Sequence, residues 1–273
     1  MAGRGCGART GRRRWSHGES ALRGARPWSR WLVSTLLVAV ACTQNPNDPE
    51  ATDDEFTAAR SSLLRDLHAQ GVTDARVLAA LSRVPRHEFV RPQDRPRAYV
   101  NRALPIGRGQ TISQPYIVAL MTQLLETRRG GKILEVGTGS GYQAAVLAAL
   151  GCDVYSIEID PHLAESARER LRTLGFGNVH VRAGDGFYGW EEAAPFDGII
   201  VTAAAPHIPE RLVAQLKPGG RLVMPLTEAQ RQVLIRATKV DDTLSIERWA
   251  DVLFVPMTGV VRTPTAPHAA GAR

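Results

Sequence analysis

Apolar residues along this chain follow two different spacings from about Gly130 onward. Short apolar runs with many β-branched residues are typical of buried strands, whereas apolar residues that recur every three or four positions are typical of helices. The strand-like runs are KILEVG, DVYSIEID, VHVRAGD and FDGIIVTA, and the helical stretches between or after them are YQAAVLAALG, PHLAESARERLRTLG and IPERLVAQLKPGG. This alternation predicts a mainly parallel sheet with helices on both of its faces.

Three further apolar runs close the pattern. RLVMPL, RQVLIRATKV and RWADVLFVPMTG follow one another with no full helical stretch between them. Because short turns join antiparallel neighbours, these runs predict an antiparallel edge to the sheet. The predicted fold class is therefore α/β, a Rossmann-like open sheet.

The chain before the sheet has a helical part and an irregular part. Residues 56–84 carry apolar residues at helical spacing in two stretches separated by QGVTD, which predicts an N-terminal helical extension. Residues 85–115 contain five prolines and two glycines with little periodicity, so we expect a long ordered loop or a set of short elements. Such a stretch inside a compact protein is usually functional.

The patterns divide the 273 residues into four segments. We expect a leader and polar linker over 1–54, the helices and an active-site loop over 55–128, a ligand-binding core over 129–262 and a flexible tail over 263–273. Within the leader, WLVSTLLVAVAC is too short to span a bilayer but has the length of a signal-peptide apolar region. It is either a lipoprotein leader over 31–42 with Cys42 lipidated, or an extension from a start codon assigned too early.

The net positive charge of the chain comes from the leader. The formal net charge is +7, and residues 1–30 hold eight Arg against one acid. The rest of the chain has 26 basic and 26 acidic residues, so its net charge does not support a nucleic-acid-binding face. Cys6, Cys42 and Cys152 lie far apart, so we expect neither a disulfide framework nor a metal site.

A glycine-rich turn follows the first predicted strand of the sheet. Gly137, Gly139 and Gly141 let the backbone turn tightly and approach a ligand, at the sheet edge where this fold class binds ligands. Their spacing is GxGxG, whereas dinucleotide dehydrogenases favour GxGxxG. Glu135 distinguishes between these ligand classes more strongly than the glycine spacing does. A carboxylate at this position would repel a pyrophosphate but suits a cationic or zwitterionic ligand.

Acids also follow the next two strands. Glu158 is placed to accept hydrogen bonds from two ribose hydroxyls, and Asp185 with the adjoining Gly186 is placed to bind an adenine amine. An acid at the end of each of three successive strands, without a Lys to bind phosphate, indicates an adenosine ligand that lacks phosphates. S-adenosylmethionine is such a ligand. The alternative is that Glu158 or Asp185 only caps the helix that follows it.

Several motifs carry a family resemblance. LEVGTGSGYQAAVLA and LKPGG are common to many class I methyltransferases, whereas VPRHEFV and GRGQTISQPYIVALM are specific. From about Leu63 to Gly259 the chain resembles protein-L-isoaspartate O-methyltransferase. The resemblance implies methyl transfer from S-adenosylmethionine to the free α-carboxyl of L-isoaspartyl residues, or to D-aspartyl side chains, in damaged proteins. The ester then closes to a succinimide, which hydrolyses in part to normal aspartate. A monomer is also implied.

Within this resemblance, Ser113 in GQTISQP matches the serine of the active-site motif. Its hydroxyl would hold the acceptor carboxylate, with Thr111 and Ile112 in the same substrate loop. The alternative is that Ser113 caps a helix that begins near Pro115. Thr202, after the fourth strand, is expected where the acceptor meets the cofactor, or else satisfies backbone groups at the strand end.

Other polar residues have less specific interpretations. We expect a structural His87 rather than a general base, since an ionised carboxylate acceptor needs none. Arg86 and Arg108 could attract an acidic substrate or only be solvated. Trp190 and Cys152 are expected to pack.

Two competing functions come from other classes. A nicotinamide-dependent oxidoreductase on this fold is disfavoured by Glu135 and by the glycine spacing. An exported, lipid-anchored protein with another acceptor or a binding role is suggested by residues 31–42. Because S-adenosylmethionine is made in the cytoplasm, we predict a cytoplasmic enzyme that meets a membrane only if Cys42 is lipidated.

Overall fold

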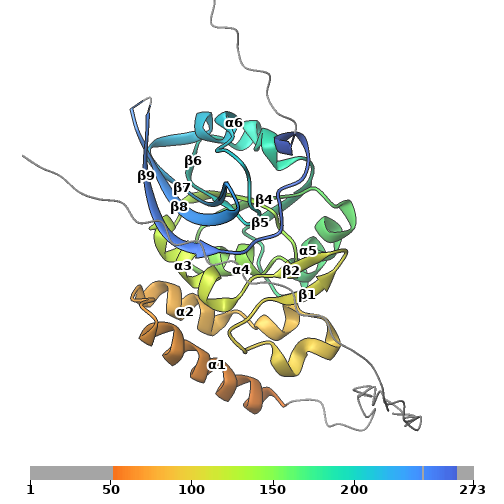
Figure 1. Cartoon of the computed structure of the whole chain (residues 1–273). Helices are drawn as coiled ribbons and strands as arrows, with labels where there is room; N and C mark the ends of the chain where they lie inside the picture. The colour runs from red at the N-terminus through yellow and green to blue at the C-terminus, as the bar shows by residue number, and fades with distance from the viewer. Residues whose placement is uncertain (1–51, 242, 263–273) are drawn as a thin grey trace, which may run out of the picture. The chain divides into compact units, whose positions relative to one another are not determined.

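A seven-stranded sheet forms the centre of the fold, in the order β5-β4-β3-β6-β7-β8-β9 (Figure 1). The computed structural model describes residues 52–241 and 243–262, so the predictions on residues 31–42, on Cys42 and on the tail lie outside the described residues. The strands are β3 (Lys132–Val136), β4 (Asp153–Glu158), β5 (Val179–Ala183), β6 (Phe196–Val201), β7 (Leu216–Glu228), β8 (Arg231–Val240) and β9 (Thr243–Val252).

Strand directions confirm the predicted fold class. Parallel pairing joins β3 to β4, β4 to β5, β3 to β6 and β6 to β7, and antiparallel pairing adds β8 and β9 at the edge. The chain moves outward from β3 to β5 and then returns to the other side of β3 as β6. This reversal puts the switch in strand order beside β3, where open α/β sheets bind their ligands.

Helices cover both faces of the sheet, but unequally. Successive side chains of a strand point to opposite faces, so Ile200 packs with one apolar cluster while Ile199 and Val201 pack with the other. Residues of α1 to α4 belong to the first cluster, whereas Leu212 of α6 belongs to the second. The described helices are α1 (Asp53–Ala69), α2 (Ala75–Arg83), α3 (Pro115–Leu125), α4 (Tyr142–Ala149), α5 (Pro161–Thr173) and α6 (Glu210–Ala214).

The predicted N-terminal helices are present and are capped at their starts. A capping box of Thr52 and Glu55 begins α1, and the Asp74 carboxylate accepts the backbone N–H of Arg76 at 2.8 Å to begin α2. Figure 1 shows both helices stacked on the α3 and α4 side of the sheet. Their apolar faces share one cluster with the sheet, so residues 55–128 pack directly on the core.

The proline-rich stretch is a set of short elements rather than one loop. It contains η1 (Arg86–Phe89), η2 (Pro92–Arg97) and a hairpin of β1 (Leu104–Gly107) and β2 (Gln110–Ile112). The hairpin turns through Gly107, Arg108 and Gly109, all at positive φ. The pairing of Leu104 with Ile112 ends the hairpin beside α3. It thereby holds residues 111–113, the TIS sequence, in place.

One helix is shorter than the sequence predicts. IPERLVAQLKPGG has helical spacing, but α6 ends at Ala214 and β7 begins at Leu216. Leu216 already pairs with Phe196, and residues 217–220 then form an irregular part of the strand before pairing resumes at Arg221. Pro218 disfavours helical backbone at the residue before it, which explains the early end.

None of the helices within residues 52–241 and 243–262 combines the length and hydropathy that crossing a bilayer requires.

Candidate active site

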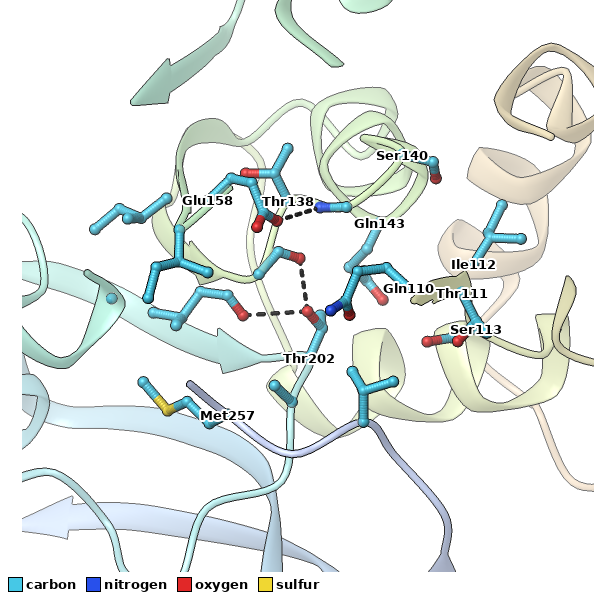
Figure 2. A pocket seen from close by; sticks show the side chains of 18 of the residues that line it. Gln110, Thr111, Ile112, Ser113, Thr138, Ser140, Gln143, Glu158, Thr202 and Met257 are labelled. Carbon is cyan, nitrogen blue, oxygen red and sulfur yellow. Dashed lines mark hydrogen bonds between the residues drawn. The ribbon is translucent and has the colours of Figure 1, made fainter. Parts of the chain in front are cut away.

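A cavity that opens to solvent lies at the carboxyl ends of β3, β4 and β6. The β1–β2 hairpin and the segment after β9 complete its wall. Figure 2 shows Ser113 and Thr111 toward one end of the cavity, Glu158 toward the other and Thr202 between them. The polar residues that line the cavity are Gln110, Thr111, Ser113, Tyr142, Thr138, Ser140, Gln143, Glu158, Thr202 and Thr258.

The glycine turn forms the floor of this cavity. Gly137 has φ of +98°, and a Cβ there would lie 2.3 Å from Thr202 Oγ1. Gly139 has φ of +53°, and Gly141, at +89°, is the N-cap of α4. Both Gly137 and Gly139 line the cavity, so their backbone can approach a bound ligand, as the sequence predicts.

Glu158 faces the cavity with a fixed carboxylate. Its Oε2 accepts the backbone N–H of Gly139 at 2.8 Å (Figure 2), and its Oε1 accepts that of Asp160 at 3.0 Å. The side chain belongs to the wall although the residue is only 6% exposed. Each carboxylate oxygen keeps a further lone pair, so Glu158 can accept two ligand hydroxyls without losing these bonds.

Glu135 lies behind the glycine turn and not in the cavity wall. Its carboxylate is fully buried and accepts a hydrogen bond from Ser156 Oγ, which lies 2.6 Å from Thr138 Oγ1. Burial raises the pKa of Glu135 to about 8, although the Ser156 hydroxyl lowers it in part. In this structure the turn that Glu135 supports separates its carboxylate from the cavity, whereas the sequence suggests a direct contact with the ligand.

The raised pKa of Glu135 predicts a pH-dependent stability. Between the ordinary value of 4.5 and about 8, the folded protein binds a proton that the unfolded chain releases, so stability falls as pH rises through this window. Glu135→Gln removes that loss, and we expect it to be more stable than the parent at pH 8 by roughly a few kcal/mol.

Urea unfolding at pH 5 and pH 8.5 measures this effect. The variant's advantage in the free energy of unfolding should grow with pH, whereas Glu210→Gln, on an exposed site, should shift little. If the free energies of unfolding of Glu135→Gln and the parent change with pH in parallel, Glu135 has the same pKa in the folded and unfolded states, and the prediction is wrong.

Asp185 is occupied by backbone groups. Its Oδ1 accepts the N–H of Phe187 at 2.9 Å, which caps η3 (Gly186–Tyr188), and its Oδ2 accepts the N–H of Val260 at 2.8 Å. Gly186 lines the cavity, and a Cβ there would lie 2.3 Å from Val136 Cγ1. The capping bond expected as the alternative is thus present, and an adenine contact by Asp185 stays a prediction.

The hairpin side of the cavity carries the predicted acceptor residues. Thr111, Ile112 and Ser113 all line it. The N-cap of α3 is Gln114, and no side-chain capping bond is made there, so the interpretation of Ser113 as a helix cap is wrong. Within the described residues, no hydrogen bond occupies Ser113 Oγ, whereas the Ser113 carbonyl accepts Arg86 Nη2 at 2.8 Å.

Thr202 is placed between the two ends of the cavity. Its hydroxyl lies 2.6 Å from the Gly137 carbonyl and 3.1 Å from that of Val136 (Figure 2). The backbone interaction expected as an alternative is therefore made. Since a hydroxyl also has acceptor lone pairs, a contact with an acceptor peptide stays a prediction.

The less specific residues lie outside the cavity wall. His87 stacks on Phe56 with ring centres 4.0 Å apart, and burial lowers its pKa. Arg86 is fully buried, so the expectation that it attracts substrate from the surface is wrong. Arg108 pairs with Asp160. Trp190 packs edge-on against Tyr155, and Cys152 is buried, as expected for both.

Sequence reasoning missed two parts of the wall. Gln143, in the first turn of α4, is buried and donates to Thr122 Oγ1 at 2.9 Å, and a lone amide in an Ala-rich helix was its only signal. Residues 255–258 were read as part of a last strand. They are instead held across the end of β6, where Met257 N–H donates to the Ala204 carbonyl at 2.7 Å.

The wall fits S-adenosylmethionine better than a dinucleotide. Among the described residues that line the cavity there is no Lys or Arg to neutralise a pyrophosphate. The Glu158 carboxylate suits ribose hydroxyls, and the open glycine turn admits a zwitterionic amino-acid group beside the N-terminus of α4. The described residues contain no cluster of three His, Cys, Asp or Glu placed to hold a metal ion.

Comparison with known families agrees with this geometry. Residues 58–262 match the family model for protein-L-isoaspartate(D-aspartate) O-methyltransferase, which covers most of the chain. The chain belongs to this methyltransferase family. The resemblance expected from VPRHEFV and GRGQTISQPYIVALM is thereby confirmed.

Individual relatives extend the match. Protein-L-isoaspartate O-methyltransferase 2 of Polaromonas sp. is 57% identical over 188 residues, which cover 68% of this chain and 89% of that protein. Protein-L-isoaspartate O-methyltransferase 1 of Cupriavidus necator is 46% identical over 246 residues, which cover 86% of this chain and 93% of that protein.

Solved structures of the family have the same fold. One protein-L-isoaspartate O-methyltransferase matches with a TM-score of 0.69 and 31% identity, covering 74% of this chain and 67% of that one. A second, from Plasmodium falciparum in complex with S-adenosyl-L-homocysteine, matches with a TM-score of 0.65 and 27% identity, covering 73% and 98%. The chain is thus an enzyme of the methyltransferase class, and the alternative of a binding module receives no support.

Proposed function

We propose that this methyltransferase uses S-adenosyl-L-methionine to methylate the free α-carboxyl of L-isoaspartyl residues, and the side chain of D-aspartyl residues, in damaged proteins. The observation that carries the proposal is the uncommitted hydroxyl of Ser113, in the same cavity wall as Glu158 and the glycine turn. S-Adenosyl-L-methionine, when bound, supplies an electrophilic methyl group on its sulfonium. Closure of the ester to a succinimide then begins repair.

The glycine end of the cavity would hold the cofactor. Glu158 would accept the two ribose hydroxyls, and the backbone of Gly137 and Gly139 would approach the amino-acid group. Gly186, with Asp185 beside it, would face the adenine. Glu135 would act indirectly, because Ser156 and Thr138 connect its carboxylate to the glycine turn.

The hairpin end would hold the acceptor. A carboxylate with an ordinary pKa of about 4 is already ionised at neutral pH, so it needs no general base. Ser113 Oγ–H would donate to one carboxylate oxygen and leave the other directed at the methyl group, while Thr111, Ile112 and Thr202 border the same space. Rate enhancement would come mainly from alignment of the carboxylate with the methyl group.

The acceptor must be recognised without strict sequence demands, because isoaspartate arises in many contexts. An extended peptide read through its backbone would satisfy this requirement. We propose that residues 55–128 form most of the acceptor side of the cavity and that residues 129–262 form its cofactor side. We further propose that the protein is a monomer, as the family resemblance implies, and that it is cytoplasmic, since the cofactor is made in the cytoplasm. Incorporation of labelled palmitate that depends on Cys42 would contradict this location.

Transfer of labelled methyl from S-adenosyl-L-methionine to an isoaspartyl peptide tests the function. We expect methylation of that peptide and none of the matched aspartyl peptide. The product should release its label as methanol at alkaline pH, because it is an ester. Transfer to the aspartyl peptide at an equal rate, or none to either with cofactor still bound, would contradict the proposed acceptor.

A further inference from the structure

Arg86 is a buried cation with no acidic partner. Its side chain is fully buried, and among the described residues no carboxylate lies within ion-pair distance of it. Burial lowers its pKa to about 10, so the guanidinium stays protonated at neutral pH. Nη1 has no hydrogen-bond partner. The described part of the chain has other buried charged residues, but Asp94, for comparison, is paired with both Arg91 and Arg97.

An unpaired buried charge is costly for folding. Transfer of an ion from water to a protein interior costs several kcal/mol unless a counter-charge and hydrogen bonds offset it. Apolar residues that replace buried ion pairs are often neutral or stabilising, so stability alone does not favour a lone Arg at this position. The position of its hydrogen-bond acceptors indicates another role.

Arg86 joins three parts of the segment that leads to the active site. Nε donates to the Ala98 carbonyl at 2.8 Å, and Nη2 donates to the Ser113 carbonyl at 2.8 Å and lies 3.4 Å from that of Arg102. Its guanidinium carbon lies 4.8 Å from the ring centre of Tyr142, which lines the cavity. One rigid planar group therefore fixes η2, the start of the hairpin and the residue whose hydroxyl faces the cavity.

The Ser113 carbonyl is held by no other hydrogen bond that the described residues make. Ser113 follows the last residue of β2 and precedes the N-cap of α3, so neither the hairpin ladder nor the helix fixes its peptide group. A shift of that peptide would move Oγ away from the acceptor. Displacements of about 1 Å can cost on the order of 100-fold in rate when alignment drives the reaction.

We infer that Arg86 is a positioning residue, which holds the main chain of Ser113 so that its hydroxyl meets the acceptor carboxylate. This inference rests on the proposed role of Ser113. It requires the forked geometry of arginine, because Nε and Nη2 reach two carbonyls 15 residues apart in the chain at once. A lysine keeps the charge but presents one compact ammonium in place of the fork.

A double-mutant cycle tests the inference, with parent, Arg86→Lys, Ser113→Ala and the double variant. Cofactor dissociation constants and thermal unfolding are measured first, and kcat is expressed per cofactor-binding site. Arg86→Lys should lower kcat about 10-fold or more with the cofactor dissociation constant within about twofold of the parent. In the Ser113→Ala background, the same change should have little further effect, because residues that act as a unit are not additive.

Arg60→Lys is the matched control. Arg60 also spans two acceptors, the Ser82 carbonyl at 2.8 Å and the Tyr99 hydroxyl at 3.1 Å, but it does not touch the hairpin. We expect its kcat to match that of the parent. If Arg86→Lys does not fold, Arg86→Gln completes the cycle, since its amide can donate to one carbonyl without burying a charge.

The outcomes separate the inference from the proposed function. An unchanged kcat for Arg86→Lys, or an equal loss in both backgrounds, overturns the role of Arg86 while the role of Ser113 stands. An unchanged kcat for Ser113→Ala overturns the proposed role of Ser113 itself. A loss of kcat that disappears in the Ser113→Ala background supports the inference, because a merely structural role would act in both.

Discussion

Ser113→Ala is expected to lower kcat for an isoaspartyl peptide by roughly 10- to 100-fold. The variant removes the hydroxyl that would orient the acceptor carboxylate, while the backbone of the TIS sequence keeps its pairing with β1. No described residue loses a hydrogen bond, because Ser113 Oγ has no partner in the described fold. Stability should therefore change by less than about 0.5 kcal/mol.

Steady-state kinetics with isoaspartyl peptide, together with cofactor titration by calorimetry, measure this effect. The cofactor dissociation constant should stay within about twofold, since the contacts proposed for the cofactor lie at the other end of the cavity. Ser82→Ala is the control, because that hydroxyl only donates to the Ala79 carbonyl within α2. Equal kcat values for both serine variants would remove Ser113 from the mechanism.

Gly137→Ala is expected to weaken cofactor binding by at least about 100-fold and to lower the free energy of unfolding by roughly 2–4 kcal/mol. Two effects combine at this position. The backbone has φ of +98°, and the new Cβ would lie 2.3 Å from Thr202 Oγ1. Relief of that clash must move Thr202, whose hydroxyl contacts the Val136 and Gly137 carbonyls, or must move the turn itself.

Gly71→Ala separates the clash from the backbone strain. Gly71 has φ of +96°, close to that of Gly137, but nothing lies within 4 Å of its added Cβ. We expect this control to cost only about 1 kcal/mol and to leave cofactor binding unchanged. Calorimetric titration and urea unfolding of both variants measure the difference. If both lose the same stability and both still bind cofactor, the close approach at Gly137 has no functional consequence.

Much of the fold could be predicted from local pattern. The strand runs around Leu134, Ile157 and Ile200 are apolar because parallel strands are covered on both faces, and this made them recognisable. The short α6 could not be predicted in the same way. Its residues have helical spacing, but pairing of Leu216 with Phe196 and the effect of Pro218 begin the strand early.

The site was predicted less evenly than the fold. Ser113, Gly137 and Glu158 were named from short motifs, and all three line one cavity. Glu135 was expected to face the ligand, yet it is buried behind the turn, because its position on β3 places it on the same face of the strand as Ile133. The segment 255–258 carried no recognisable motif, and its place in the wall follows from hydrogen bonds with the end of β6.

The sequence by itself determined the fold class, the methyltransferase family and the residues of the motifs. These properties depend on the spacing of residues along the chain, such as the apolar period of a strand or the glycines of a turn. That spacing can be read directly from the sequence. Only the tertiary structure decided which groups face the cavity and which stay behind it. Arg86 illustrates the difference, because its burial and its bonds to the Ala98 and Ser113 carbonyls depend on how distant segments pack.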